Sequence, residues 1–356
     1  MERLSAQIAP AKTRDIKVLQ FGEGNFLRAF VDYFLDIANE LGKFDGSVVV
    51  VKPIEYGNLD RFHAQDNRYT VLLRGMQDDL AVETSRIVTC IQGAVDCYTD
   101  YDRYAALARL VSLRFIVSNT TEAGIVLDTN DSYAFTPPRS YPGKLTKFLF
   151  DRAEHFGYAP DKGLIILPVE LIDDNGVELK RFVYTLARQW SLGDRFIRWM
   201  DDACVFASTL VDRIVTGYPR HEDKAIWQKL GYEDQLLDTA EPFGLWVIES
   251  HRDIRKEFPL DACGLPVIFT DNQKPYKQRK VRILNGAHTS FVPVAFLCGY
   301  DIVKQAISDQ RIKRFILDTL HTEVIPTLEL PKEDLESFAD AVIARFENPF
   351  IEHRLL

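Results

Sequence analysis

The chain has 356 residues, of which 46% are hydrophobic, so it is long enough for two domains with cores of their own. A net charge of −9 disfavours non-specific binding to nucleic acid. The five cysteines are scattered and form no CxxC pair, which argues against a disulfide framework and a zinc knuckle. No apolar run approaches about 18 residues and no signal peptide is visible, so we expect a cytoplasmic protein without a membrane span.

The first informative stretch predicts a strand, a glycine turn and a helix. Ile16–Phe21 is typical of a short buried strand, and an apolar-periodic run to Leu41 follows the turn. This order is the context of a dinucleotide-binding fingerprint, in which the glycines allow a tight turn and close approach of a pyrophosphate to the helix N-terminus. The third glycine of the fingerprint is missing, so a plain glycine-rich turn remains an equal alternative. The candidates for cofactor contact are Gly22, Gly24, Asn25, Phe26 and Arg28.

Two further strand ends contribute candidates. The aliphatic run Ser47–Val51 indicates a buried parallel strand, and it ends at Lys52 where an acidic residue usually holds the ribose of NAD. Lys52 would suit the 2′-phosphate of NADP, so these residues leave the choice of cofactor open. A polar turn follows the strand Arg114–Asn119, at the sheet edge where ligands bind. Its candidates for the nicotinamide half are Asn119, Thr121 and Glu122, although plain turn formers are as good an interpretation.

The strand pattern is expected to end the first domain near residue 185. Leu164–Ile172 is the last long strand-like run, and helix after helix is expected beyond it. The predicted fold class is therefore α/β, with a Rossmann-type nucleotide-binding domain at 1–185 and a mostly α-helical substrate domain at 186–356.

Lys280-Val-Arg-Ile-Leu-Asn285-Gly-Ala-His288 combines an amine, an amide and an imidazole. In an α-helix, Asn285 and His288 would lie about 140° and 80° around the axis from Lys280, within one broad arc. Such a group suits carbonyl and alcohol chemistry, because an amine can transfer a proton and an amide can polarise an oxygen. The alternative is an ordinary helix start with a basic first turn. Three basic residues just before Lys280 fit an anionic substrate or a solvated turn equally well.

Four blocks, in this order, resemble the polyol-specific long-chain dehydrogenase/reductase family, which includes mannitol dehydrogenases, fructuronate reductases and tagaturonate reductases. The blocks are Phe21–Phe30, Ser118–Gly124, Val211–Pro219 and Lys280–His288. The resemblance implies a Rossmann-type domain, a helical domain, a site between them and metal-independent hydride transfer with NAD. It also implies that Lys280 is the general acid/base, that Asn285 polarises the reacting oxygen and that His288 orients or helps bind it.

The first two blocks look most like the tagaturonate-reducing branch, which implies a small sugar-acid substrate and conversion of D-tagaturonate to D-altronate. The candidates for substrate contact are Glu170, Asn175, Lys277 and Arg282. Two features depart from the family: Leu171 replaces a second oxyanion Asn of polyol-oxidising relatives, and the chain ends at Leu356 where the family's helical domain continues. The helical domain is therefore expected to be incomplete. The alternatives are a fructuronate reductase, a polyol dehydrogenase and a non-catalytic NAD-binding protein, and the oligomeric state stays open.

Overall fold

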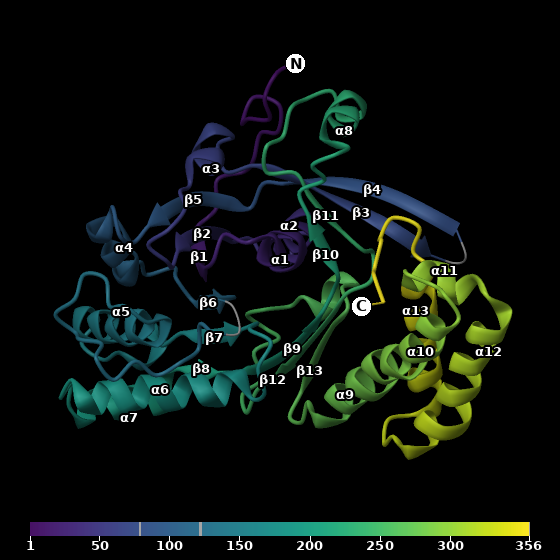
Figure 1. Ribbon diagram of the computed structural model, residues 1–356. Helices are drawn as coiled ribbons and strands as arrows, with labels where there is room; N and C mark the ends of the chain where they lie inside the picture. The colour runs from purple at the N-terminus through teal and green to yellow at the C-terminus, as the bar shows by residue number, and fades with distance from the viewer. Residues whose placement is uncertain (78–79, 121–122, 356) are drawn as a thin grey trace.

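A parallel six-stranded sheet organises the first part of the chain in the computed structural model, which describes residues 1–77, 80–120 and 123–355. Its strand order is β5-β2-β1-β6-β7-β8, so the first strand lies near the centre (Figure 1). The predicted strands at residues 16, 47, 115 and 165 are confirmed, and so is the Rossmann-type arrangement. The strands are β1 Ile16–Phe21, β2 Ser47–Lys52, β5 Ile91–Asp96, β6 Phe115–Ser118, β7 Ile165–Pro168 and β8 Val205–Phe206.

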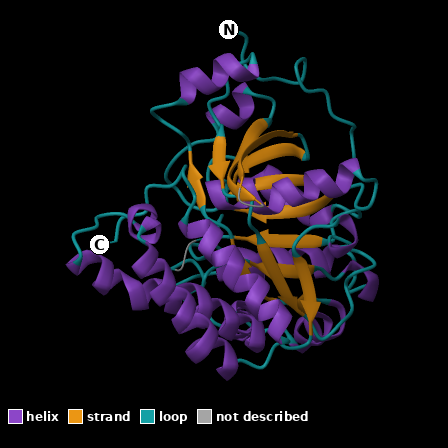
Figure 2. Cartoon of the chain, turned by 90° about the vertical axis from the view of Figure 1, so that its right-hand side faces the viewer, coloured by secondary structure: helices purple, strands orange, loops and turns teal. Residues whose placement is uncertain are grey.

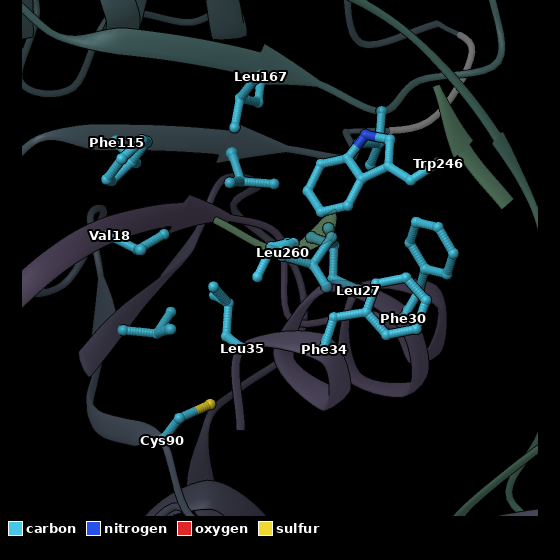
Figure 3. Close-up of a cluster of buried hydrophobic side chains, with 14 of the residues drawn as sticks. Val18, Leu27, Phe30, Phe34, Leu35, Cys90, Phe115, Leu167, Trp246 and Leu260 are labelled. Carbon is cyan, nitrogen blue, oxygen red and sulfur yellow. The ribbon is translucent and has the colours of Figure 1, made fainter. Parts of the chain in front are cut away.

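Two cores cover the two faces of this sheet, because side chains alternate along each strand. Val18 of β1 packs into one core with Phe30 and Phe34 of the first helix, as Figure 3 shows. Leu19 and Phe21 point into the opposite core, which helices α4, α5, α6 and α7 complete. The first helix runs without interruption through α1 Asn25–Leu27, the π-helix η1 Arg28–Asp32 and α2 Tyr33–Glu40. The opposite helices are α4 Tyr101–Ala106, α5 Tyr141–His155, α6 Asn175–Gln189 and α7 Asp194–Ala203.

Two smaller sheets lie beside the first one. Residues 69–77 and 80–88 pair as the hairpin β3–β4, whose long ribbons reach toward α11 in Figure 1. The expectation of helix after helix from residue 186 onward is wrong for residues 205–270, which contain six short strands. The order is β10-β11-β3-β4 in one sheet and β13-β12-β9 in the other. The strands are β3 Tyr69–Gln77, β4 Leu80–Val88, β9 Ser208–Asp212, β10 Val215–Gly217, β11 Asp238–Ala240, β12 Leu245–Glu249 and β13 Val267–Thr270.

A helical unit begins at Lys274 and carries a third core of its own, to which Ile283, Phe291 and Phe338 contribute. Figure 2 shows these helices grouped at one side of the stacked strands. The expectation of successive helices is confirmed for this part of the chain. The members are α9 Lys274–Arg279, π-helix η5 Lys280–Asn285, α10 Gly286–Leu297, α11 Val303–Ser308, α12 Gln310–Asp318, π-helix η6 Thr319–Val324, 3₁₀-helix η7 Ile325–Thr327 and α13 Lys332–Phe346.

Short helices fill the connections. They are α3 Asp60–Ala64, α8 Asp223–Leu230 and the 3₁₀-helices η2 Leu107–Arg109, η3 Pro160–Lys162 and η4 Asp261–Cys263. Over the described ranges, none of the helices combines the length and apolar character needed to cross a bilayer. The domain boundary near residue 185 stays a prediction, although β8 of the central sheet comes from beyond it.

Candidate functional site

The glycine turn after β1 has the shape that a dinucleotide turn requires. Gly22 has φ +123°, and a Cβ there would lie 2.9 Å from the carbonyl oxygen of Asn119. Gly24 has an ordinary φ of −69° but no protein atom within 4 Å of its Cβ position, so its backbone faces open space. The first helix begins at Asn25, directly after this open backbone.

Arg28 lies in the π-helix η1 but does not point to the open side of the turn. Its guanidinium is buried, donates to the Leu236 carbonyl and the Asn25 amide oxygen, and lies 3.4 Å from the Asp238 carboxylate. Burial raises the pKa of Asp238 to about 6, while Arg28 opposes that shift. Arg28 therefore fits a role in fixing the turn from behind better than the predicted direct phosphate contact.

The ammonium of Lys52 is also bound by groups of the protein itself. Its side chain is fully buried, and Nζ donates to the carbonyls of Ile54, Glu55 and Tyr56. The same ammonium lies 3.2 Å from the Asp96 carboxylate. The lysine thus holds the loop after β2 in place, and its charge is not available to a 2′-phosphate.

The carboxyl edges of β6 and β7 bring some of the predicted residues to the site and keep others away from it. Asn119 lines a cavity at this edge. Glu170 is buried and accepts hydrogen bonds from Ser118 and Thr120 at 2.9–3.0 Å, so it supports the turn after β6. Asn175 is fully buried and bonds the Pro168, Glu170 and Thr209 backbones. The predicted residues Thr121 and Glu122 lie outside the described residues.

The cavity at the sheet edge, called the edge cavity below, has a volume of about 620 Å³. Its walls come from three separate regions of the chain: the ends of β1, β6 and β7, the end of β9, and Lys280 of the helical unit. The lining residues are Phe26, Asn119, Ala123, Val169, Leu171, Val211, Asp212, Arg213 and Lys280. Leu171, which replaces the second oxyanion Asn of polyol-oxidising relatives, is 61% exposed and gives this wall an apolar surface.

Lys280 is the titratable amine of the edge cavity. Its Nζ donates a hydrogen bond of 2.9 Å to the carbonyl of Val211 at the end of β9. Burial lowers the pKa of Lys280 below its ordinary value, Asp212 opposes this shift and Arg345 adds to it. A lowered pKa makes a lysine ammonium a stronger proton donor, which suits carbonyl/alcohol chemistry.

The predicted α-helical register of the Lys280 stretch is wrong, because Lys280–Asn285 forms the π-helix η5. In a π-helix the backbone bonds run from i to i+5, and single π-turns occur frequently at functional sites. Lys280 and Asn285 are therefore separated by one π-turn, not arranged on the predicted arc. Val281 and Arg282 between them point outward and are exposed.

Asn285 and His288 line a second cavity, called the His288 cavity below, which has a volume of about 430 Å³. The His288 ring stacks on His353 with centroids 5.2 Å apart, and its buried Nε2 has no hydrogen-bond partner among the described residues. Burial lowers the pKa of His288, as does His353. The remaining lining residues are Asp212, Ile214, Leu284, Thr289, Val303, Lys304, Arg345, Phe346 and Ile351.

A buried ion cluster separates Lys280 from His288, and the sequence did not reveal it. Arg345 of α13 contacts Asp212 at 3.0 and 3.1 Å and Glu241 at 2.8 and 2.9 Å. Asp212 lines both cavities and therefore lies between them. Asp212 lies in Val211–Pro219, one of the four blocks that carry the family resemblance, but Arg345 lies in a regular helix outside those blocks.

The two cations predicted to contact the substrate line neither cavity. Lys277 pairs with Asp173 across the gap between α9 and the loop after β7. Arg282 donates to Thr327 in the helical unit at 3.1 Å. Within residues 1–77, 80–120 and 123–355, no group of three His, Cys, Asp or Glu side chains is arranged to hold a metal ion.

Together, the parallel sheet, its glycine turn and a lysine facing the carboxyl edge define a two-domain dehydrogenase of the nucleotide-binding class. Residues 16–261 match the Mannitol dehydrogenase Rossmann domain, and residues 272–356 match the Mannitol dehydrogenase C-terminal domain. The chain belongs to the mannitol dehydrogenase family.

Relatives in sequence and in structure agree with this membership. Altronate oxidoreductase of Yersinia pestis bv. Antiqua (strain Nepal516) is 46% identical over 357 residues, which are 100% of this chain and 74% of the relative. Altronate oxidoreductase of Escherichia coli O7:K1 (strain IAI39 / ExPEC) is 47% identical with the same coverage. A D-sorbitol dehydrogenase structure in substrate-free form superposes with a TM-score of 0.84 at 22% identity, covering 100% of this chain and 76% of that one.

A second structure, Pseudomonas fluorescens mannitol 2-dehydrogenase in a ternary complex with NAD and D-mannitol, has a TM-score of 0.75 at 21% identity. It covers 99% of this chain and 75% of that chain. At these identities the two structures confirm the fold.

Proposed function

We propose that this protein is an NAD-dependent oxidoreductase that interconverts D-tagaturonate and D-altronate. The observation that carries the proposal is Lys280, a lysine with a lowered pKa whose Nζ enters the edge cavity beside the end of the parallel sheet. The relatives named altronate oxidoreductase, at 46–47% identity over the whole chain, support this substrate pair.

The residues at the sheet edge fit a nicotinamide dinucleotide. The open backbone at Gly24 and the helix start at Asn25 suit a pyrophosphate, because helix N-termini favour anions. Gly22, Gly24, Asn25 and Phe26 would hold this half, and Asn119 would lie beside the nicotinamide. The buried Lys52 favours NAD over NADP, because its ammonium is already bound to three carbonyls and Asp96. The nicotinamide supplies the hydride in reduction and accepts it in oxidation.

Lys280 acts as the proton donor in reduction. As negative charge develops on the substrate oxygen, the ammonium gives up a proton to it, and the neutral amine takes the proton back in oxidation. The hydrogen bond to the Val211 carbonyl fixes Nζ in the cavity wall before the substrate arrives. Asn285 and His288 line the adjoining His288 cavity, so we assign them to the part of the substrate that extends into it and not to the oxygen beside Lys280.

Lys280→Ala tests the assignment directly. We expect turnover of tagaturonate with NADH to fall by about three orders of magnitude or more, because general acid catalysis and charge stabilisation are lost together. Calorimetry with NAD is the control, since Lys280 is not part of the glycine turn and binding should survive. Near-normal turnover in the variant would exclude Lys280 as the proton donor.

Substrate and cofactor are tested with the wild-type protein. Initial rates with tagaturonate and fructuronate, each with NADH and NADPH, should be highest for tagaturonate with NADH. Faster turnover of fructuronate would assign the protein to the other uronate. NAD binding without turnover of either uronate would favour a non-catalytic binding protein.

A further inference from the structure

We propose that Lys304 and His353 form the site that binds the carboxylate of the sugar acid, at the far end of the His288 cavity. This inference rests on the proposed function, because it assigns a position to the acid group of that substrate. Neither the Lys304 nor the His353 side chain takes part in the proposed proton transfer at Lys280.

Lys304 is a cation without a partner among the residues that the structure describes. It is half-buried at the start of α11 and lines the His288 cavity. Among the described residues, its ammonium makes neither an ion pair nor a hydrogen bond. A partly buried ammonium in a cavity favours an anionic ligand, since the ligand restores the charge interactions that burial weakens.

His353 is held next to Lys304 by backbone pairing. The Val303 amide donates to the His353 carbonyl at 2.8 Å, and an isolated antiparallel bridge joins Ile302 to Arg354. The His353 ring in turn stacks on His288. The same wall of the cavity therefore carries one ammonium and two imidazoles.

Arg345, which also lines this cavity, already pairs with two carboxylates of the protein. Arg345 places its three nitrogen atoms on the carboxylates of Asp212 and Glu241. It therefore has little capacity left for a third carboxylate, whereas Lys304 has all of its donors available. Lys277 and Arg282 line neither cavity.

The acid group of the substrate lies away from its reacting carbon. In tagaturonate the carboxyl carbon lies four bonds from the ketone carbon, which is about 5 Å in an extended chain. With the ketone beside Lys280 in the edge cavity, we place the acid end on the side of Asp212, which lines both cavities, and in the His288 cavity. The hydroxyl groups between them would pass the Asp212 carboxylate, which can accept their hydrogen bonds.

The test compares an acid with its neutral analogue. Lys304→Met and His353→Phe remove donors while keeping chain length and ring stacking, and Lys304→Arg restores the charge. In calorimetry with NAD present, we expect each of the first two variants to bind altronate about 10- to 100-fold more weakly, as loss of a charge-assisted hydrogen bond implies. Their affinity for altritol, which has a hydroxymethyl group in place of the carboxylate, should stay within about 2-fold.

Arg314→Met is the matched control, because Arg314 is an exposed cation of α12 and its loss changes the net charge equally. It should leave both affinities unchanged. Equal weakening of altronate and altritol by Lys304→Met, or an unchanged affinity for altronate, would overturn the carboxylate site. Failure of the proposed function is distinguishable, because it appears as absent tagaturonate turnover in the wild-type protein.

Discussion

Replacing Arg345 by Met should strongly destabilise the fold, because it leaves two buried carboxylates without their cation. Asp212 is 6% exposed, Glu241 is 1% exposed, and both depend on the same guanidinium. Removing one partner of a buried ion pair costs about 3–5 kcal/mol. We expect a loss of this size in the free energy of unfolding at pH 8, measured by urea denaturation with the fluorescence of the buried Trp246 as the probe.

The loss should also depend on pH. Burial raises the pKa of Glu241 and Arg345 opposes this shift, so removing Arg345 raises the pKa further. A carboxyl group whose pKa is higher in the folded protein binds a proton more readily there, and its contribution to stability increases as the pH falls. The deficit of Arg345→Met should therefore be smaller at pH 5 than at pH 8.

Arg279→Met is the matched control for this experiment. Arg279 is equally buried and packs on the Phe338 ring at 4.5 Å, but in the described part of the chain it makes no ion pair. Its replacement should cost only about 1–2 kcal/mol and should show little dependence on pH. Equal losses in the two variants, or a pH-independent loss for Arg345→Met, would refute the reasoning.

Two further predictions concern the glycine turn and the pH profile. Gly22→Ala should lower the free energy of unfolding by about 1–3 kcal/mol in urea denaturation, because it forces a side chain into a positive φ and against the Asn119 carbonyl. Gly24→Val should change stability little but weaken NAD binding in calorimetry at least about 10-fold. The same loss of stability in both variants would contradict this distinction. Because the pKa of Lys280 is lowered by burial, kcat/KM for reduction should fall, and that for oxidation should rise, as the pH increases through it. Asp212→Asn removes a charge that raises this pKa, so both inflections should move to lower pH, and a shift to higher pH would exclude the assignment.

The central sheet could be predicted because its strands carry strong local patterns. Ser47–Val51 is aliphatic at nearly every position, and the strand before Gly22 leads directly into a helix. The shortest strands in 205–270 were missed for the opposite reason. β8 has two residues and β11 has three, which is too short for a periodic pattern, and both are stabilised by pairing with distant segments.

The candidate site was only partly predictable. The spacing from Lys280 to His288 marked three residues, but spacing does not show into which cavity each side chain points. Lys52 and Asn175 were selected as polar residues at strand ends, yet their side chains bind the protein's own backbone. A polar residue at a sheet edge has the same sequence signal whether it contacts a ligand or fixes a loop.

The amino-acid sequence alone determined the class of fold, the glycine turn and the lysine proposed as the proton donor, because strand patterns, turn residues and motif spacing are local properties. Only the tertiary structure decided that Lys280 and His288 face different cavities, that Asp212 and Arg345 lie between them and that Lys304 has no partner among the described residues. These relations join residues up to 133 positions apart, as for Asp212 and Arg345. Contacts of that separation depend on how three sheets and a helical unit pack, which no single stretch of sequence specifies.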